Sequence, residues 1–187
     1  MSDAGENNNM DQLIIRNARI ADGLGNPLID GDLSVRDGRV TEVGLVEGQA
    51  EQEFDAQGMV LAPGAVDLHT HYDAQLTWDA TASPSVGLGV TTVVTGNCGF
   101  GVAPAPRDKR DMILANLAEV EGMSLESLEA GMQWGFESFP EYLEFLKHKG
   151  AYPNVAVLAS HTVMRTAVMG EAGSDRPSTP KELETML

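Results

Sequence analysis

The residues of this sequence best suited to chemistry are two histidines separated by a single residue, His69 and His71. They stand at the end of a mostly apolar segment, Ala65-Val66-Asp67-Leu68-His69, which is bounded by turn residues and predicts a β-strand. Residues two apart on a strand point to the same face, so both imidazoles can bind one divalent cation. Such a cation lowers the pKa of a bound water to about 7 and polarises a carbonyl, as amide hydrolysis near neutral pH requires. Two incidental polar residues of a loop are the alternative, and the preceding Pro63-Gly64 turn favours the metal.

The only cysteine, Cys98, lies in Gly96-Asn97-Cys98-Gly99 and cannot form an intrachain disulfide. It follows the β-branched run Val90-Thr91-Thr92-Val93-Val94-Thr95, which predicts a parallel strand buried on both faces. Flanking glycines let the backbone approach a ligand, so we expect a metal-binding thiolate, which favours zinc over magnesium or calcium. A buried small apolar side chain is one alternative. A nucleophile is another, although the sequence shows no nearby base.

Three further polar residues are candidates for the same site. Asp73 stands two positions after His71, so on a continuing strand its side chain points to the same face as the two imidazoles. It can orient a metal-binding imidazole, or it is an ordinary loop carboxylate. His161 follows a third apolar segment, Asn154-Val155-Ala156-Val157-Leu158-Ala159, and Arg165 comes about one helical turn later. Arg165 can bind a substrate carboxylate through its planar guanidinium, with a surface ion pair as the alternative. We therefore predict His161 and Arg165 as substrate-binding residues.

Strands that alternate with helices must position these side chains. Helical patterns separate the second and third strands, over Ile113 to Val120, over 125–132 and over 138–149. The last of them opens with a capping box, Ser138-Phe139-Pro140-Glu141, and a second capping box over 179–182 opens a further helix. This order predicts an α/β fold of βα units around a parallel sheet, with functional residues at the carboxyl ends of the strands.

We predict three segments along the chain. Residues 1–12 are polar and acidic and are expected to form a disordered tail. Residues 13–58 contain short β-segments, and Asp37-Gly38 between two of them predicts a tight hairpin turn in a small β-rich domain. Residues 59–187 form the first βα units of a TIM-like (β/α)8 barrel. The chain has 187 residues, and a complete barrel needs roughly 250, so we expect it to be truncated.

Composition excludes several kinds of partner. The formal net charge of −16 repels phosphate backbones and anionic lipid surfaces, so we expect no nucleic acid and no membrane partner. No apolar run approaches the roughly 20 residues that span a bilayer. The N-terminus lacks the basic start and apolar core of a signal peptide, which predicts a cytoplasmic protein.

The motifs resemble a known family. Val66-Asp67-Leu68-His69-Thr70-His71-Tyr72-Asp73 and the later Gly96-Asn97-Cys98-Gly99 are similar to the N-acyl-D-amino-acid deacylase (D-aminoacylase) branch of the metal-dependent amidohydrolase superfamily. The resemblance implies a (β/α)8 barrel flanked by a β-sandwich, to which the N-terminal segment contributes. It also implies that His69 and His71 share a metal position and that Cys98 helps to bind one or two zinc ions. It places the general base and two further histidines beyond Leu187.

The leading hypothesis is a zinc-dependent hydrolase that deacylates small N-acyl-D-amino acids with metal-activated water. A cyclic-amide hydrolase of the hydantoinase or dihydroorotase type is the first alternative. A fragment without catalytic activity is the second.

Overall fold

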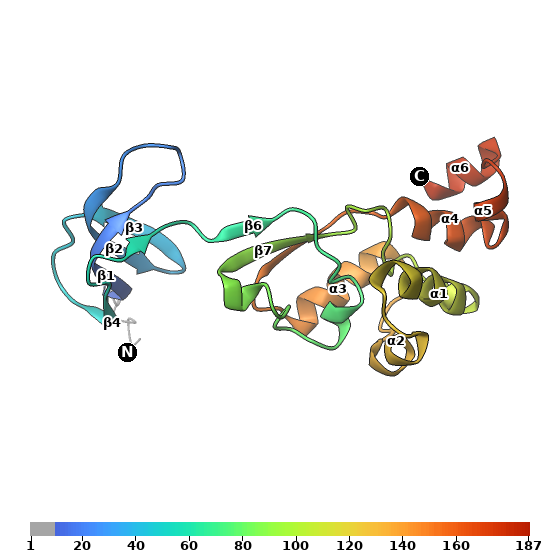
Figure 1. The fold of residues 1–187 in the computed structure, drawn as a ribbon, viewed down its shortest axis with the longest axis horizontal. Helices are drawn as coiled ribbons and strands as arrows, with labels where there is room; N and C mark the ends of the chain where they lie inside the picture. The colour runs from blue at the N-terminus through green and yellow to red at the C-terminus, as the bar shows by residue number, and fades with distance from the viewer. Residues whose placement is uncertain (1–9) are drawn as a thin grey trace, which may run out of the picture. The chain divides into compact units, whose positions relative to one another are not determined.

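The computed structural model describes residues 10–187, which form two compact units that divide between Pro63 and Gly64 (Figure 1). Most of the predicted tail, residues 1–9, lies outside the described residues. Strand β1 begins at Asp11, so the last two residues of the predicted tail belong to a strand. The reason is pairing, because Asp11 lies opposite Ala50 in a parallel ladder and its carboxylate forms an ion pair with Arg36 at 3.0 Å.

The first unit is a five-stranded sheet in which β1 is central. The strand order is β3-β2-β1-β4, and β5 also pairs with β1. The strands are β1 (Asp11–Ile20), β2 (Ile29–Arg36), β3 (Arg39–Gly44), β4 (Ala50–Asp55) and β5 (Val60–Leu61). The predicted hairpin joins β2 to β3, and Asp37 and Gly38 have the positive φ values, 52° and 69°, that a tight turn between antiparallel strands requires.

The second unit contains a three-stranded parallel sheet in the order β6-β7-β8, which confirms the predicted α/β class. Its strands are β6 (Ala65–Asp67), β7 (Val90–Thr95) and β8 (Asn154–Val157). Its α-helices are α1 (Arg110–Glu121), α2 (Leu125–Gly131), α3 (Phe139–Lys149), α4 (His161–Met169), α5 (Ala172–Asp175) and α6 (Pro180–Met186). Short 3-10 turns lie at Gln75–Thr77, Val86–Leu88 and Arg107–Lys109. Both predicted capping boxes are present, at Ser138 before α3 and at Thr179 before α6.

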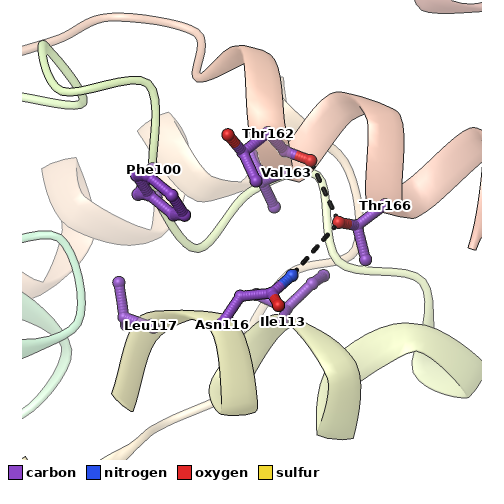
Figure 2. Close-up of a pocket in the computed structure, with 8 residues that line it drawn as sticks. Phe100, Ile113, Asn116, Leu117, Thr162, Val163 and Thr166 are labelled. Carbon is purple, nitrogen blue, oxygen red and sulfur yellow. Dashed lines mark hydrogen bonds between the residues drawn. The ribbon is translucent and has the colours of Figure 1, made fainter. Parts of the chain in front are cut away.

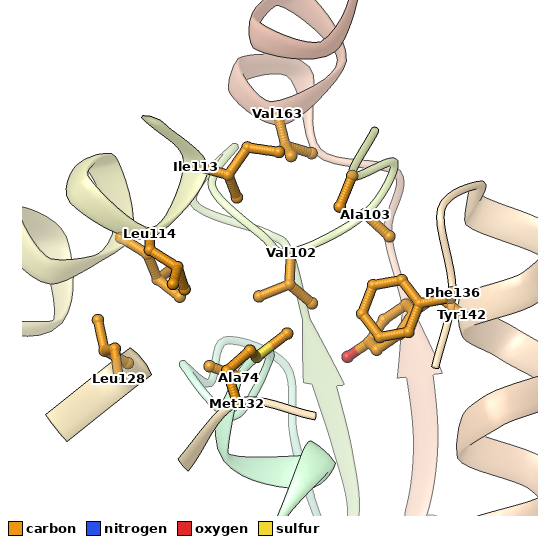
Figure 3. Packing of buried hydrophobic residues seen from close by; sticks show 12 residues of the cluster. Ala74, Val102, Ala103, Ile113, Leu114, Leu128, Met132, Phe136, Tyr142 and Val163 are labelled. Carbon is orange, nitrogen blue, oxygen red and sulfur yellow. The ribbon is translucent and has the colours of Figure 1, made fainter. Parts of the chain in front are cut away.

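The hydrophobic core of the second unit lies between α1, α3 and the loop that follows β7. Val102 lies at the centre of this cluster, with Ile113 and Leu114 of α1 on one side and an aromatic pair on the other (Figure 3). That pair is Phe136 and Tyr142, whose ring centroids are 4.7 Å apart. Because Val102 is packed on both sides, the loop that carries Cys98 and Val102 is fixed against α1. No helix within residues 10–187 has the length and apolar character needed to cross a bilayer.

Candidate metal centre

The two histidines and the cysteine singled out in the sequence lie together in the second unit. One ligand atom from each of His69, His71 and Cys98 lies within 4.8 Å of the other two. His69 is exposed, the side chain of His71 is 36% exposed, and Cys98 is half-buried. Within the described part of the chain, this is the one group of three or more His, Cys, Asp or Glu side chains close enough to hold a metal ion.

The histidines do not lie on a strand, contrary to the prediction. Strand β6 ends at Asp67, because its carboxylate accepts a hydrogen bond from the backbone N–H of His69 at 3.2 Å and turns the chain. Thr70 then holds the segment beside β7, since its backbone N–H and its hydroxyl both donate to the carbonyl of Val94. The imidazoles on either side of Thr70 still lie face to face, with ring centroids 5.5 Å apart and planes 15° apart.

The loop after β7 brings Cys98 to the histidines. Asn97 donates a hydrogen bond from Nδ2 to the carbonyl of Leu68 at 2.9 Å, which ties this loop to the histidine segment. Gly96 has a φ of 78°, and a Cβ there would collide with the carbonyl of Leu158. We expected this glycine to let the backbone approach a ligand. Instead it lets the end of β7 approach the chain that follows β8.

Sequence reasoning missed one residue of the site, Glu121. Its Oε1 lies 3.3 Å from Nδ1 of His71, and its side chain is only 12% exposed. Burial raises the pKa of Glu121 to about 7. No local pattern identifies this residue, because it is simply the last residue of α1 and its partner lies 50 positions earlier in the chain.

Asp73 follows His71 by two positions and is almost completely buried, at 3% exposure. Burial raises the pKa of Asp73 to about 7; backbone N–H groups, including that of Gly96, oppose this rise and the nearby charge of Glu121 adds to it. The hydrogen bonds found among residues 10–187 include none between Asp73 and an imidazole. The structure therefore contains an acidic pair, Asp73 and Glu121, of which only Glu121 contacts a histidine.

The two predicted substrate-binding residues differ in their surroundings. His161 is the exposed first residue of α4 and is not part of the three-residue group. Arg165 donates hydrogen bonds to the carbonyls of Gly173, at 2.6 and 3.0 Å, and of Arg176, at 2.7 Å. These bonds from Nε and Nη2 hold the α5 segment against α4, and a role of Arg165 in substrate binding stays a prediction.

A small cavity lies between α1 and α4 (Figure 2). Its lining includes Ile113 and Leu117 of α1, Phe100 and Val163, and it contains no acidic or basic side chain. Across it, Asn116 Nδ2 contacts Thr166 Oγ1 at 3.4 Å (Figure 2). This region has the character of a helix-packing interface and lacks groups that bind a charged substrate.

The donor set of the three-residue group fits zinc. Two imidazoles and a thiolate are ligands that zinc accepts, and three protein ligands with one open position are typical of catalytic zinc sites. Tetrahedral zinc with bonds of this kind places its ligand atoms roughly 3.5 Å apart. The three atoms lie within 4.8 Å of one another, somewhat wider than that spacing.

Known proteins share both the sequence and the fold of this chain. The profile of the amidohydrolase family matches residues 52–187. The chain is 37% identical to an N-acyl-D-aspartate deacylase of Alcaligenes xylosoxydans xylosoxydans over 174 residues, which cover 92% of this chain and 32% of that protein.

Two crystal structures show the same similarity. One is an N-acyl-D-glutamate deacylase from Bordetella bronchiseptica complexed with zinc and a phosphonate inhibitor, with a TM-score of 0.71 and 31% identity over 95% of this chain and 35% of that one. The other is a D-aminoacylase, with a TM-score of 0.75 and 31% identity over 93% of this chain and 34% of that one. The predicted resemblance to D-aminoacylases is confirmed, and the chain spans about a third of the length of these relatives.

Proposed function

We propose, since this chain belongs to the amidohydrolase family, that the protein containing it is a metal-dependent hydrolase of linear amide bonds. Its substrates are small N-acyl-D-amino acids, from which it releases the D-amino acid. The observation that carries this proposal is the meeting of His69, His71 and Cys98 at the end of a parallel sheet. The similarity to deacylases of N-acyl-D-aspartate and N-acyl-D-glutamate supports the choice of substrate class.

In this proposal His69, His71 and Cys98 hold one or two zinc ions. When bound, zinc lowers the pKa of a water molecule to about 7 and polarises the amide carbonyl. The Cys98 thiolate supplies a negative charge to the cation, and the loop that carries it is fixed by Asn97. His161 is exposed at the start of α4 and is our proposed contact to the substrate. The general base is a residue beyond Leu187.

The same proposal covers the architecture. The second unit, from Gly64 onward, supplies the first βα units of a (β/α)8 barrel, and the first unit contributes to a β-sandwich. The boundary predicted at 58/59 shifts to 63/64, because β5 pairs with β1. The parallel order β6-β7-β8 supports the first part, because functional residues of such barrels lie at the carboxyl ends of the strands. A cytoplasmic location stays a prediction.

An assay of the gene product tests the proposed activity. Its intact mass is first compared with the 19.9 kDa of this chain, to establish how much further sequence it contains. Hydrolysis is then followed on matched N-acyl-D- and N-acyl-L-amino acids, before chelation, after chelation and after addition of zinc. We expect hydrolysis of the D-enantiomers that is lost on chelation and restored by zinc.

A pair of variants provides the control for this assay. His69→Ala removes a proposed metal ligand, whereas His148→Ala removes an exposed histidine of α3 whose side chain is 83% exposed. We expect His69→Ala alone to abolish hydrolysis. Ring opening of hydantoins without any deacylation would contradict the proposed substrate class, and equal activity of the two variants would contradict the proposed role of His69.

A further inference from the structure

Glu121 occupies a fixed position beside the proposed metal centre. It is the last residue of α1, a helix anchored by the buried side chains of Ile113, Leu114 and Leu117. The helix ends directly after it, because Gly122 adopts a left-handed conformation with a φ of 62°. The backbone of Glu121 is therefore held by the core, and its carboxylate lies 3.3 Å from Nδ1 of His71.

This position is unfavourable for a carboxylate by itself. The C-terminus of a helix carries the negative end of the helix dipole, which repels an anion. A side chain that is 12% exposed also loses most of its hydration. Among the described residues, the one side-chain nitrogen of a histidine, lysine or arginine found within 4.0 Å of the Glu121 carboxylate is Nδ1 of His71, so this imidazole is the group that the buried carboxylate faces.

We propose that Glu121 is a positioning residue that holds the ring of His71 so that Nε2 faces the cation. A carboxylate beside Nδ1 keeps the proton on that nitrogen, which leaves the lone pair on Nε2 and makes it a better ligand. The inference rests on the proposed metal centre at His69, His71 and Cys98.

The test measures metal affinity in this 187-residue chain, with no need for activity. Zinc affinity is determined by competition with a chromophoric chelator for the unsubstituted chain and for Glu121→Gln and Glu121→Ala. Glu119→Gln is the matched control, because Glu119 is an exposed residue of the same helix and the substitution makes the same change in charge. Circular dichroism verifies that each variant is folded.

We expect both Glu121 variants to bind zinc about 10- to 100-fold more weakly than the unsubstituted chain, as is typical when the partner of a ligating histidine is removed. Glu119→Gln should bind zinc like the unsubstituted chain. Affinity in the Glu121 variants equal to that of Glu119→Gln would overturn the inference and leave the metal centre standing. A chain that binds no zinc at all would overturn both.

A second measurement needs no substitution at Glu121. Long-range proton–nitrogen NMR of the zinc-loaded chain identifies which nitrogen of His71 carries the proton, with the signals assigned from His71→Ala. We expect a proton on Nδ1 and zinc on Nε2. Zinc on Nδ1 of His71, or cobalt spectra that show Glu121 itself as a ligand, would overturn the positioning role.

Discussion

The hydroxyl of Tyr142 donates a hydrogen bond of 2.8 Å to the main-chain carbonyl of Asp73, a residue 69 positions earlier in the chain. Tyr142 is completely buried in α3, and Asp73 lies two residues after the second histidine of the proposed metal centre. The bond therefore joins a helix of the second unit to the segment that carries both imidazoles. It explains how a stretch of chain beyond the end of β6 keeps a defined course.

Tyr142→Phe should destabilise the second unit by about 1 to 2 kcal/mol, because the buried carbonyl of Asp73 loses its donor while the ring keeps its packing on Phe136. Unfolding in denaturant, followed by the fluorescence of Trp78 and Trp134, measures this change. Both tryptophans belong to the second unit. Tyr152→Phe is the control, since Tyr152 is 76% exposed, and an equal effect of the two substitutions would refute the role of the hydrogen bond.

Gly96→Ala should destabilise the chain more than Gly99→Ala. Both glycines have positive φ, 78° and 87°, so each substitution pays a similar backbone cost of roughly 1 to 2 kcal/mol. Only at Gly96 does the new methyl group meet the carbonyl of Leu158, whereas nothing lies within 4 Å at Gly99. Denaturant unfolding in the presence of a chelator compares the two without a contribution from metal. Equal losses of stability would show that close approach to the chain after β8 is unimportant.

Asp79 should make the stability of the second unit depend on pH in the acidic range. Hydrogen bonds from Thr81 and Gln75 lower the pKa of Asp79 from its ordinary value of 3.8 to about 2. Since the folded-state pKa is the lower one, the stabilisation is fully present above the ordinary value and is lost as pH falls from about 4 towards 2.

The variant Asp79→Asn tests this pH dependence. An amide at this position cannot gain from ionisation, and its NH2 group faces either Gln75 Nε2 or the donors of Thr81. We expect lower stability near neutral pH and a flatter dependence between pH 4 and 2, measured by tryptophan fluorescence. An unchanged slope in the variant would contradict the assignment to Asp79.

Local signals in the sequence were sufficient for the features that depend on neighbouring residues. The helix α3 follows from a capping box at Ser138 and a proline in the first turn, and the structure contains both. The hairpin at Asp37-Gly38 depends only on positive φ at two adjacent positions. In both cases the residues that determine the structure are within a few positions of one another.

Features that depend on distant contacts were missed. The helix α4 was not predicted, and the serine before it, Ser160, donates its hydroxyl to the carbonyl of Phe100 and does not cap the helix. Glu121 contacts a histidine 50 positions away. The two histidines were placed on a strand because the apolar pattern continues through Leu68, but the carboxylate of Asp67 turns the chain first. Their meeting with Cys98 did not require the strand, since Thr70 and Asn97 hold both segments together.

The most direct test of the account is a cobalt(II) titration of this chain followed by absorption spectroscopy. If His69, His71 and Cys98 bind one cation, cobalt should produce a thiolate-to-metal charge-transfer band that saturates with added metal. The band should disappear in Cys98→Ser and persist in His148→Ala. The absence of such a band in the unsubstituted chain, or an unchanged spectrum in Cys98→Ser, would contradict the proposed metal centre.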